Sequence, residues 1–148
     1  MSTPAVVQFE ITGADSANLQ RFYGSLFGWQ ANPTGTPGYA RILGSQSGIP
    51  GAIGPSWDGG RGQLTVYVEV PDLQQTLAHA EQLGGRVIGA PSEDARRVKR
   101  VAQWSPELRA HVVPGAGISF SFVADPEGHV VAVSHGLEPA LGQFAARH

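Results

Sequence analysis

The chain has 148 residues, enough for one domain with a sizeable core, and 41% of them are hydrophobic. Ten Lys and Arg against 12 Asp and Glu give a formal net charge of −2, which lacks the basic surplus expected of a nucleic-acid-binding protein. The single basic run, from Arg96 to Arg100, follows two acidic residues and is interpreted as a solvated loop. The absence of cysteine excludes disulfides, thiol catalysis and cysteine-bound metals.

The sequence shows no pattern typical of export or of membrane insertion. Residues 1–4 contain no basic segment and no apolar run follows them, so no signal peptide is predicted. The longest charge-free stretches are interrupted by Gly and Pro and are too short to span a membrane. These features predict a cytoplasmic protein with neither nucleic acid nor membrane as a partner.

A strand followed by a helix is predicted at the start of the chain. Residues 6–11 form an apolar-rich run with β-branched side chains, which favours a strand. Asp15 can cap the helix that follows, and Gly28 can end it in a left-handed conformation. The apolar residues of this helix recur at helical spacing and form one face: Leu19, Phe22, Tyr23, Leu26 and Phe27.

The same pattern returns further along the chain. Residues 64–70 predict a strand, and Asp72 is the N-cap of a second helix with Gln75 as its capping-box partner. Gly84 and Gly85 are predicted to end this helix. Because 57 residues separate Asp15 from Asp72 and also Gly28 from Gly85, the chain is interpreted as a duplicated strand–helix unit.

Short strands are predicted after each helix, so that each half follows the order β-α-β-β-β. The predicted strands are residues 39–43 and 50–54, joined by a Gly-rich loop at 44–48, and residues 86–89, 118–123 and 130–134. The last two flank a turn at Asp125–Gly128, and a strand near Val98 or Val112 would complete the second half. A single domain over 1–148 is expected, with module one at 5–54, a linker at 55–62, module two at 63–135 and a C-terminal tail at 136–148.

Three ordered segments together resemble the vicinal oxygen chelate superfamily, which contains glyoxalase I, bleomycin and fosfomycin resistance proteins and extradiol dioxygenases. The segments are residues 8–29, residues 66–85 and the turn at 125–129, and the resemblance extends over residues 5–135. It implies an α+β fold in which two βαβββ modules form a curled mixed sheet around a ligand cavity. It also implies a homodimer.

The resemblance further implies where a metal ion would be bound in the metal-dependent members. Two ligands come from each module, one on its first strand and one on its last. Gln8 occupies the first of these positions and is a permitted ligand. Thr65 and Ala132 occupy the two positions in module two, and residues 50–54 provide neither a carboxylate nor a histidine. One amide oxygen cannot hold a divalent cation, so we expect no metal and no cofactor.

Strand alternation predicts which side chains line the cavity. Gln8, Glu10 and Thr12 share one face of the first strand, and Val7, Phe9 and Ile11 share the other. The corresponding cavity face in module two carries Thr65, Tyr67 and Glu69 on one strand and Val130, Ala132 and Ser134 on another. Glu10 and Glu69 are the candidate general bases, unless they lie solvated near the rim of the sheet. Tyr67 is either a hydrogen-bond donor to a ligand or part of the wall.

The remaining candidates are an aromatic residue and five histidines. Residues 91–117 form a long connection that carries Trp104, which is placed either in a lid near the cavity or against the exterior of the sheet. The histidines show no metal-binding spacing and are interpreted as structural or surface residues, with His111 in the long loop.

The sequence therefore predicts a metal-free protein that binds a small organic ligand, as bleomycin-resistance-type members do by sequestration. Its predicted ligand-binding residues are Gln8, Thr65, Tyr67, Trp104 and Ser134. The alternative is a metal-independent isomerase, cyclase or lyase that uses Glu10 or Glu69 as a base on a natural product or other small metabolite. A metalloenzyme with an atypical ligand set is a third reading. A homodimer is also expected from the exposed sheet edges and from an apolar stripe in the tail, formed by Leu137, Leu141 and Phe144.

Overall fold

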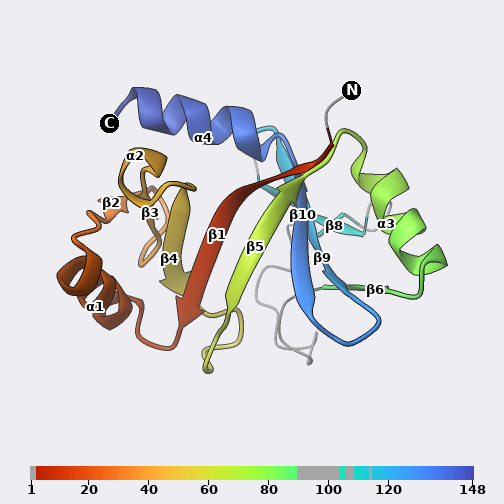
Figure 1. The fold of residues 1–148 in the computed structure, drawn as a ribbon, viewed down its shortest axis with the longest axis horizontal. Coiled ribbons are helices and arrows are strands. Elements are labelled where there is room, and N and C mark those ends of the chain that lie inside the picture. Colours follow the sequence, from red (N-terminus) through yellow and green to blue (C-terminus); the bar gives the residue numbers. More distant parts are fainter. Residues whose placement is uncertain (1–2, 90–103, 106–108, 114) are drawn as a thin grey trace.

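The computed structural model describes residues 3–89, 104–105, 109–113 and 115–148 (Figure 1). The basic run at 96–100 and a strand near Val98 lie outside these residues. Residues 104 and 105 are described as backbone only, so the predicted role of the Trp104 side chain also lies outside the described part of the chain.

The first module supplies a long strand, two helices of unequal length and three shorter strands. Its elements are β1 (Ala5–Gly13), α1 (Ser16–Phe27), β2 (Asn32–Pro33), β3 (Ala40–Ile42), α2 (Gly44–Ser47) and β4 (Gly51–Pro55). The second module and the tail supply β5 (Leu64–Glu69), α3 (Leu73–Gln82), β6 (Arg86–Ile88), β7 (Trp104–Ser105), β8 (Ala110–Val113), β9 (Ile118–Ala124), β10 (Val130–His135) and α4 (Leu137–Ala146).

The strands form one curled, open sheet in the order β2-β3-β4-β1-β5-β10-β9-β8-β7, with β6 also paired to β9 (Figure 1). In each module the last long strand lies parallel to the first: β4 beside β1, and β10 beside β5. The antiparallel pairing of β1 with β5 joins the two modules at the centre of the sheet. This arrangement confirms the predicted α+β fold and places the first strand of each module next to that of the other.

The helix ends largely follow the predicted caps. The side chains of Asp15 and Asp72 accept hydrogen bonds from the backbone N–H groups of Asn18 and Gln75, at 3.0 and 2.9 Å. Gly28 ends α1 in the left-handed region with φ of 77°. In module two the left-handed residue is Gly84, with φ of 96°, one position earlier than the 57-residue offset predicts.

The two module helices pack differently. Leu73 and Leu77 of α3 are buried against the sheet in a cluster with Val70 and Val133. Helix α1 buries none of its residues completely, and Phe22 and Phe27 remain 55% and 56% exposed. The apolar stripe of α1 therefore forms a surface and is not part of the core.

The tail helix α4 packs on its own chain. Leu137 and Leu141 belong to the core cluster that contains Tyr67 and Phe120, and they are 4% and 9% exposed. The expectation that this stripe docks on a neighbouring chain was wrong for these two leucines, because the open face of the sheet already buries them.

Three further expectations need correction. A β-bulge between Val6 and Gln8 breaks the alternation of β1, and Val7 packs in the cluster of Tyr67 instead of on the opposite face. The loop at 44–48 contains the short helix α2. His111 lies on strand β8 and not in a loop, which confirms the predicted strand near Val112.

The turn before β10 is fixed by a carboxylate, as its sequence suggests. Asp125 accepts hydrogen bonds from the backbone N–H groups of His129 and Glu127, both at 2.9 Å, and the bond from His129 is the main cause that lowers the pKa of Asp125.

Within the described residues, no helix is long and apolar enough to cross a bilayer.

Candidate functional site

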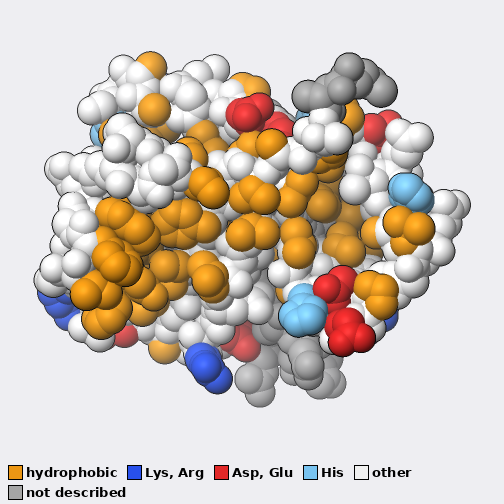
Figure 2. Space-filling view, viewed as in Figure 1, with side chains coloured by type: hydrophobic (Ala, Val, Ile, Leu, Met, Phe, Trp, Pro, Cys, Tyr) orange, Lys and Arg blue, Asp and Glu red, His pale blue; other side chains and the backbone are white. Residues whose placement is uncertain are grey.

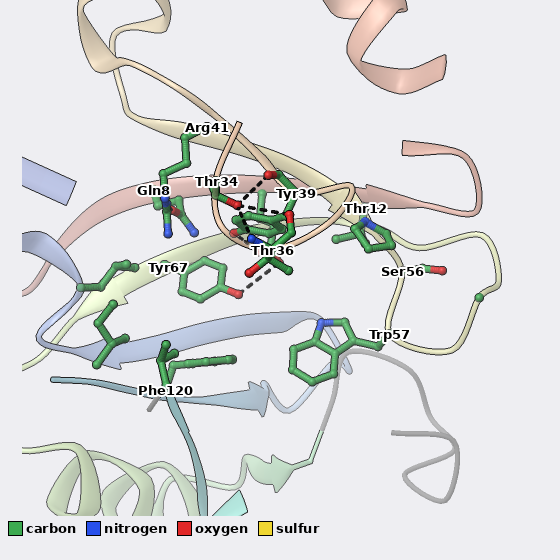
Figure 3. A pocket seen from close by; sticks show the side chains of 16 residues that line it. Gln8, Thr12, Thr34, Thr36, Tyr39, Arg41, Ser56, Trp57, Tyr67 and Phe120 are labelled. Atoms are coloured by element: carbon green, nitrogen blue, oxygen red, sulfur yellow. Dashed lines mark hydrogen bonds between the residues drawn. The ribbon is translucent and has the colours of Figure 1, made fainter. Parts of the chain in front are cut away.

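A cavity of about 450 Å³ opens on the face of the sheet that carries Gln8, Glu10 and Thr12 (Figure 3). Strands from both modules, the connection after β4 and helix α4 contribute to its wall. Its principal lining residues are Gln8, Glu10, Thr12, Tyr39, Arg41, Trp57, Tyr67, Phe120 and Leu137. The cavity thus lies between the two modules, where the resemblance predicts a ligand.

Glu10 is the carboxylate at the centre of this wall. It is 5% exposed, so the alternative of a solvated side chain near the rim was wrong. The hydroxyl of Tyr39 donates to its Oε2 at 2.7 Å, and the hydroxyl of Tyr67 donates to its Oε1 at 3.1 Å. Two phenolic donors on one carboxylate fix its orientation.

A glycine on the neighbouring strand makes room for Tyr39. Gly54 pairs with Thr12 and so lies on the cavity face of β4. A Cβ atom at Gly54 would lie 2.4 Å from Cδ2 of Tyr39, closer than side chains pack. The missing side chain allows the Tyr39 ring to lie against β4 with its hydroxyl at Glu10.

Arg41 reaches the cavity from β3 across the neighbouring strand. Its register partner on β4 is Ala52, which is fully buried and small. The Nη1 atom of Arg41 donates to Oε1 of Gln8 at 2.6 Å, and the Gln8 side chain is itself 1% exposed. The cavity wall therefore carries a fixed cation beside a buried amide.

Aromatic rings form the opposite wall. Figure 3 shows Trp57 and Phe120 across the cavity from Arg41, Gln8 and Tyr39. The rings of Trp57 and Phe120 have centroids 6.2 Å apart, and the ring of His111 packs against both at 4.9 and 5.2 Å. His111 is 1% exposed, and its Nε2 contacts the carbonyl oxygen of Gly89. It thus supports the aromatic wall from behind.

The structure does not bring Glu69 into the cavity with Glu10. Its carboxylate accepts hydrogen bonds from the Ser134 hydroxyl at 2.8 Å and from the backbone N–H groups of Gly136 and Leu137 at 2.9 and 3.3 Å. Glu69 therefore caps the start of α4, and Ser134 is buried as its donor. Both lie on the predicted face of their strands, but the cavity wall does not include either of them.

Two of the other predicted binding residues take different places. Tyr67 lines the cavity, as its wall reading predicts, and its hydroxyl donates to Glu10; donation to a ligand stays a prediction. Thr65 is 4% exposed and pairs with Glu10 across the strands, but it does not reach the cavity surface.

The donor set does not fit the metal of the metal-dependent relatives. Oxygen Oε1 of Gln8 already accepts from the Arg41 guanidinium, whose charge would repel a cation. Ala52 on β4 and Ala132 on β10 offer no side-chain donor, and Thr65 lies outside the cavity wall. No group of three or more His, Cys, Asp or Glu side chains within the described residues has metal-binding geometry. No chemical step is therefore assigned to a metal.

Tyr39 and Arg41 are the site residues that the sequence reasoning missed. Both belong to the predicted strand at 39–43, and they are separated by two positions, which places them on one face. The alternation that identified Gln8 and Glu10 could have identified this pair, had it been applied to that strand.

Comparison with known proteins identifies the fold family. A profile described as the glyoxalase-like domain matches residues 8–134 of the chain. A search of curated protein sequences finds no significant match.

Several solved structures share the fold at low sequence identity. A member of the glyoxalase/bleomycin resistance protein/dioxygenase superfamily from Vibrio splendidus 12B01 is 12% identical with a TM-score of 0.54, covering 90% of this chain and 99% of that one. A variant of methylmalonyl-CoA epimerase from Streptomyces coelicolor, in complex with 2-nitronate-propionyl-CoA, is 15% identical with a TM-score of 0.54, covering 90% and 95%. The Mn(II)-bound glyoxalase from Novosphingobium aromaticivorans is 12% identical with a TM-score of 0.55, covering 90% of this chain but 38% of that one.

The profile covers most of the chain, and these solved structures share its fold. The chain belongs to the glyoxalase-like domain family of the vicinal oxygen chelate superfamily.

Proposed function

We propose that this protein binds a small organic ligand in the cavity between its modules, without a metal, as bleomycin-resistance-type members do by sequestration. The observation that carries the proposal is that one wall of the cavity is aromatic and the facing wall is polar. An aromatic wall of Trp57 and Phe120 faces a polar wall of Gln8, Glu10 and Arg41, within about 450 Å³. Apolar surface with a few fixed polar groups is the usual composition of a small-molecule site.

A thermal-shift screen over a metabolite library, run with EDTA present, tests this proposal. A ligand at about 100 times its Kd should stabilise the protein by about 2.7 kcal/mol and raise Tm by about 5–10 °C. The exposed cavity residue Thr36 provides a blocking variant, Thr36→Trp, and Thr3→Trp near the N-terminus is the matched control.

The ligand should raise Tm in the wild type and in Thr3→Trp but not in Thr36→Trp. An equal rise of Tm in all three proteins would place the ligand outside the cavity. A shift that requires an added divalent metal would contradict the metal-free part of the proposal.

The alternative is a metal-independent isomerase, cyclase or lyase in which Glu10 is the general base. One observation favours it: the Glu10 carboxylate is buried, lines the cavity and is oriented by two phenols. The Streptomyces coelicolor protein with this fold is named an epimerase. A positioned carboxylate is the kind of group that proton-transfer chemistry requires. Glu69 is not retained as a base, because its oxygens are engaged at the start of α4.

A further inference from the structure

Arg41 is a cation in the cavity wall without a carboxylate partner among the described residues. Within the described residues, its guanidinium donates to the neutral amide oxygen of Gln8 at 2.6 Å. The nearby carboxylate of Glu10 instead accepts from the hydroxyls of Tyr39 and Tyr67. A guanidinium has five N–H donors, so among the described residues the bond to Gln8 leaves further donors of Arg41 for a ligand.

The orientation of Arg41 is restricted on several sides. Its guanidinium carbon lies 5.5 Å from the ring centroid of Tyr39 and 5.9 Å from that of Phe144 on α4, within the range of cation–π contacts. Because its hydrogen bond to Gln8 crosses the buried Ala52, the side chain extends over β4 toward the cavity. A preorganised guanidinium loses less entropy on binding a planar oxyanion.

The apolar part of a ligand has a defined place as well. Trp57 and Phe120 lie across the cavity from Arg41, as Figure 3 shows. An aromatic ring against these side chains would leave a substituent of a few atoms pointing toward Arg41. A single guanidinium, in a cavity that already contains the Glu10 carboxylate, matches a singly charged oxyanion better than a dianion.

We infer that Arg41 and Gln8 form an anion subsite for the carboxylate of a small aromatic carboxylic acid, whose ring packs against Trp57 and Phe120. The guanidinium donates to the carboxylate oxygens, and Gln8 holds the guanidinium in place. This inference rests on the proposed binding function and specifies the charge and class of the ligand.

Paired probes that differ only in charge test the inference. We suggest benzoate, 2-naphthoate and indole-3-acetate, each beside its uncharged amide, titrated by calorimetry in buffer with EDTA. A charge-assisted hydrogen bond in a partly buried site should favour the carboxylate by about ten- to a hundredfold in Kd.

Arg41→Gln should abolish this preference by weakening the carboxylates about ten- to a hundredfold with little change for the amides. Arg41→Lys retains the charge but not the planar fork and should give an intermediate preference, which also guards against misfolding of the Gln variant. Arg21→Gln on the exposed surface of α1 is the matched control and should behave as wild type.

The outcomes separate this inference from the function on which it rests. Amides that bind as tightly as the carboxylates, with binding lost in Thr36→Trp, would overturn the anion subsite and leave the binding function intact. A carboxylate preference that persists in Arg41→Gln would also overturn the subsite. If no probe of either kind bound, the aromatic-acid subsite would be overturned, whereas the proposed function fails only if the thermal-shift screen finds no ligand that binds in the cavity.

Discussion

Glu10 is the residue on which the two functional readings differ most. Its two oxygens each accept a phenolic hydrogen bond, so the carboxylate holds the Tyr39 and Tyr67 hydroxyls in place. If the protein only binds its ligand, these contacts shape the polar wall. If it is an enzyme, the same contacts orient the carboxylate toward a proton of the ligand, and general-base catalysis typically raises the reaction rate 10²–10⁴-fold.

Glu10→Gln distinguishes these readings. The amide oxygen can accept from one tyrosine hydroxyl and the amide N–H group can donate to the other, so the cavity wall should persist. A ligand identified by the thermal-shift screen is incubated with the protein in D₂O, and deuterium uptake is followed by mass spectrometry. If Glu10 is the base, the rate of deuterium uptake by the ligand should fall by about 10²–10⁴-fold in Glu10→Gln, while the ligand is still bound.

The matched control is Glu127→Gln in the exposed turn before β10, which should leave uptake unchanged. Undiminished uptake in Glu10→Gln would eliminate Glu10 as the base. No uptake with the wild type, for ligands that bind tightly, would favour sequestration.

At the scale of elements, the carboxylate of Glu69 connects β5 to the first turn of α4. It accepts from Ser134, Gly136 and Leu137, and anions at a helix N-terminus are favoured by the helix dipole. Because Leu137 and Leu141 of α4 pack beside Tyr67, this cap helps to hold the helix over the cavity.

Glu69→Gln should therefore lower the free energy of unfolding, with little effect on ligand binding or on any catalytic rate. Loss of charged hydrogen bonds at this site should cost about 2 kcal/mol, or about 4–8 °C in Tm. Calorimetry of Glu69→Gln beside Glu138→Gln, an exposed residue in the same first turn, measures the effect. Equal Tm values for the two variants would show that Glu69 does not anchor the helix.

The sequence predicted elements better than it predicted their contacts, for a physical reason. The caps at Asp15 and Asp72 and the turn at Asp125 depend on residues two to four positions away, which the sequence displays directly. The hydrogen-bond partners of Glu69 lie more than 60 positions away in the sequence. Whether its side chain lines the cavity or caps a helix therefore depends on where α4 packs. The bulge at Val7 likewise arises from pairing with β5.

Strand alternation predicted part of the candidate site, but it also placed Thr65, Glu69 and Ser134 in a cavity wall that does not include them. Gln8, Glu10 and Tyr67 lie in the cavity as expected. Tyr39, directly before β3, and Arg41 on β3 obey the same rule. Their reach into the cavity depends on the small residues Ala52 and Gly54 of β4, which neither segment reveals by itself.

At the scale of the whole molecule, an apolar surface lies opposite the cavity. Figure 2 shows hydrophobic side chains gathered over α1 and over the neighbouring central strands, with charged groups around them. Exposed residues of this kind include Phe22, Leu26 and Phe27 of α1 and Val66 of β5. A two-fold dimer can cover such an apolar surface with the same surface of a second copy, so the predicted homodimer remains our proposal for what covers it.

Leu26→Glu should weaken this dimer, because each copy would bury an unpaired carboxylate in the interface. Sedimentation velocity at micromolar concentration should give a dimer for the wild type and a monomer for Leu26→Glu. Leu83→Glu is the control, since Leu83 is similarly exposed, at 68% against 57% for Leu26, and follows α3 instead. A monomeric wild type would refute the prediction, and dissociation of both variants would place the interface elsewhere.

Ligand binding between the modules can be tested by a crystal structure of the metal-stripped protein with its tightest-binding small molecule. We expect the ligand in the cavity between the modules, with its rings against Trp57 and Phe120, an oxyanion within hydrogen-bonding distance of Arg41 and no bridging metal ion. A ligand seated outside this cavity, or a metal ion that binds Gln8 and the ligand together, would contradict it.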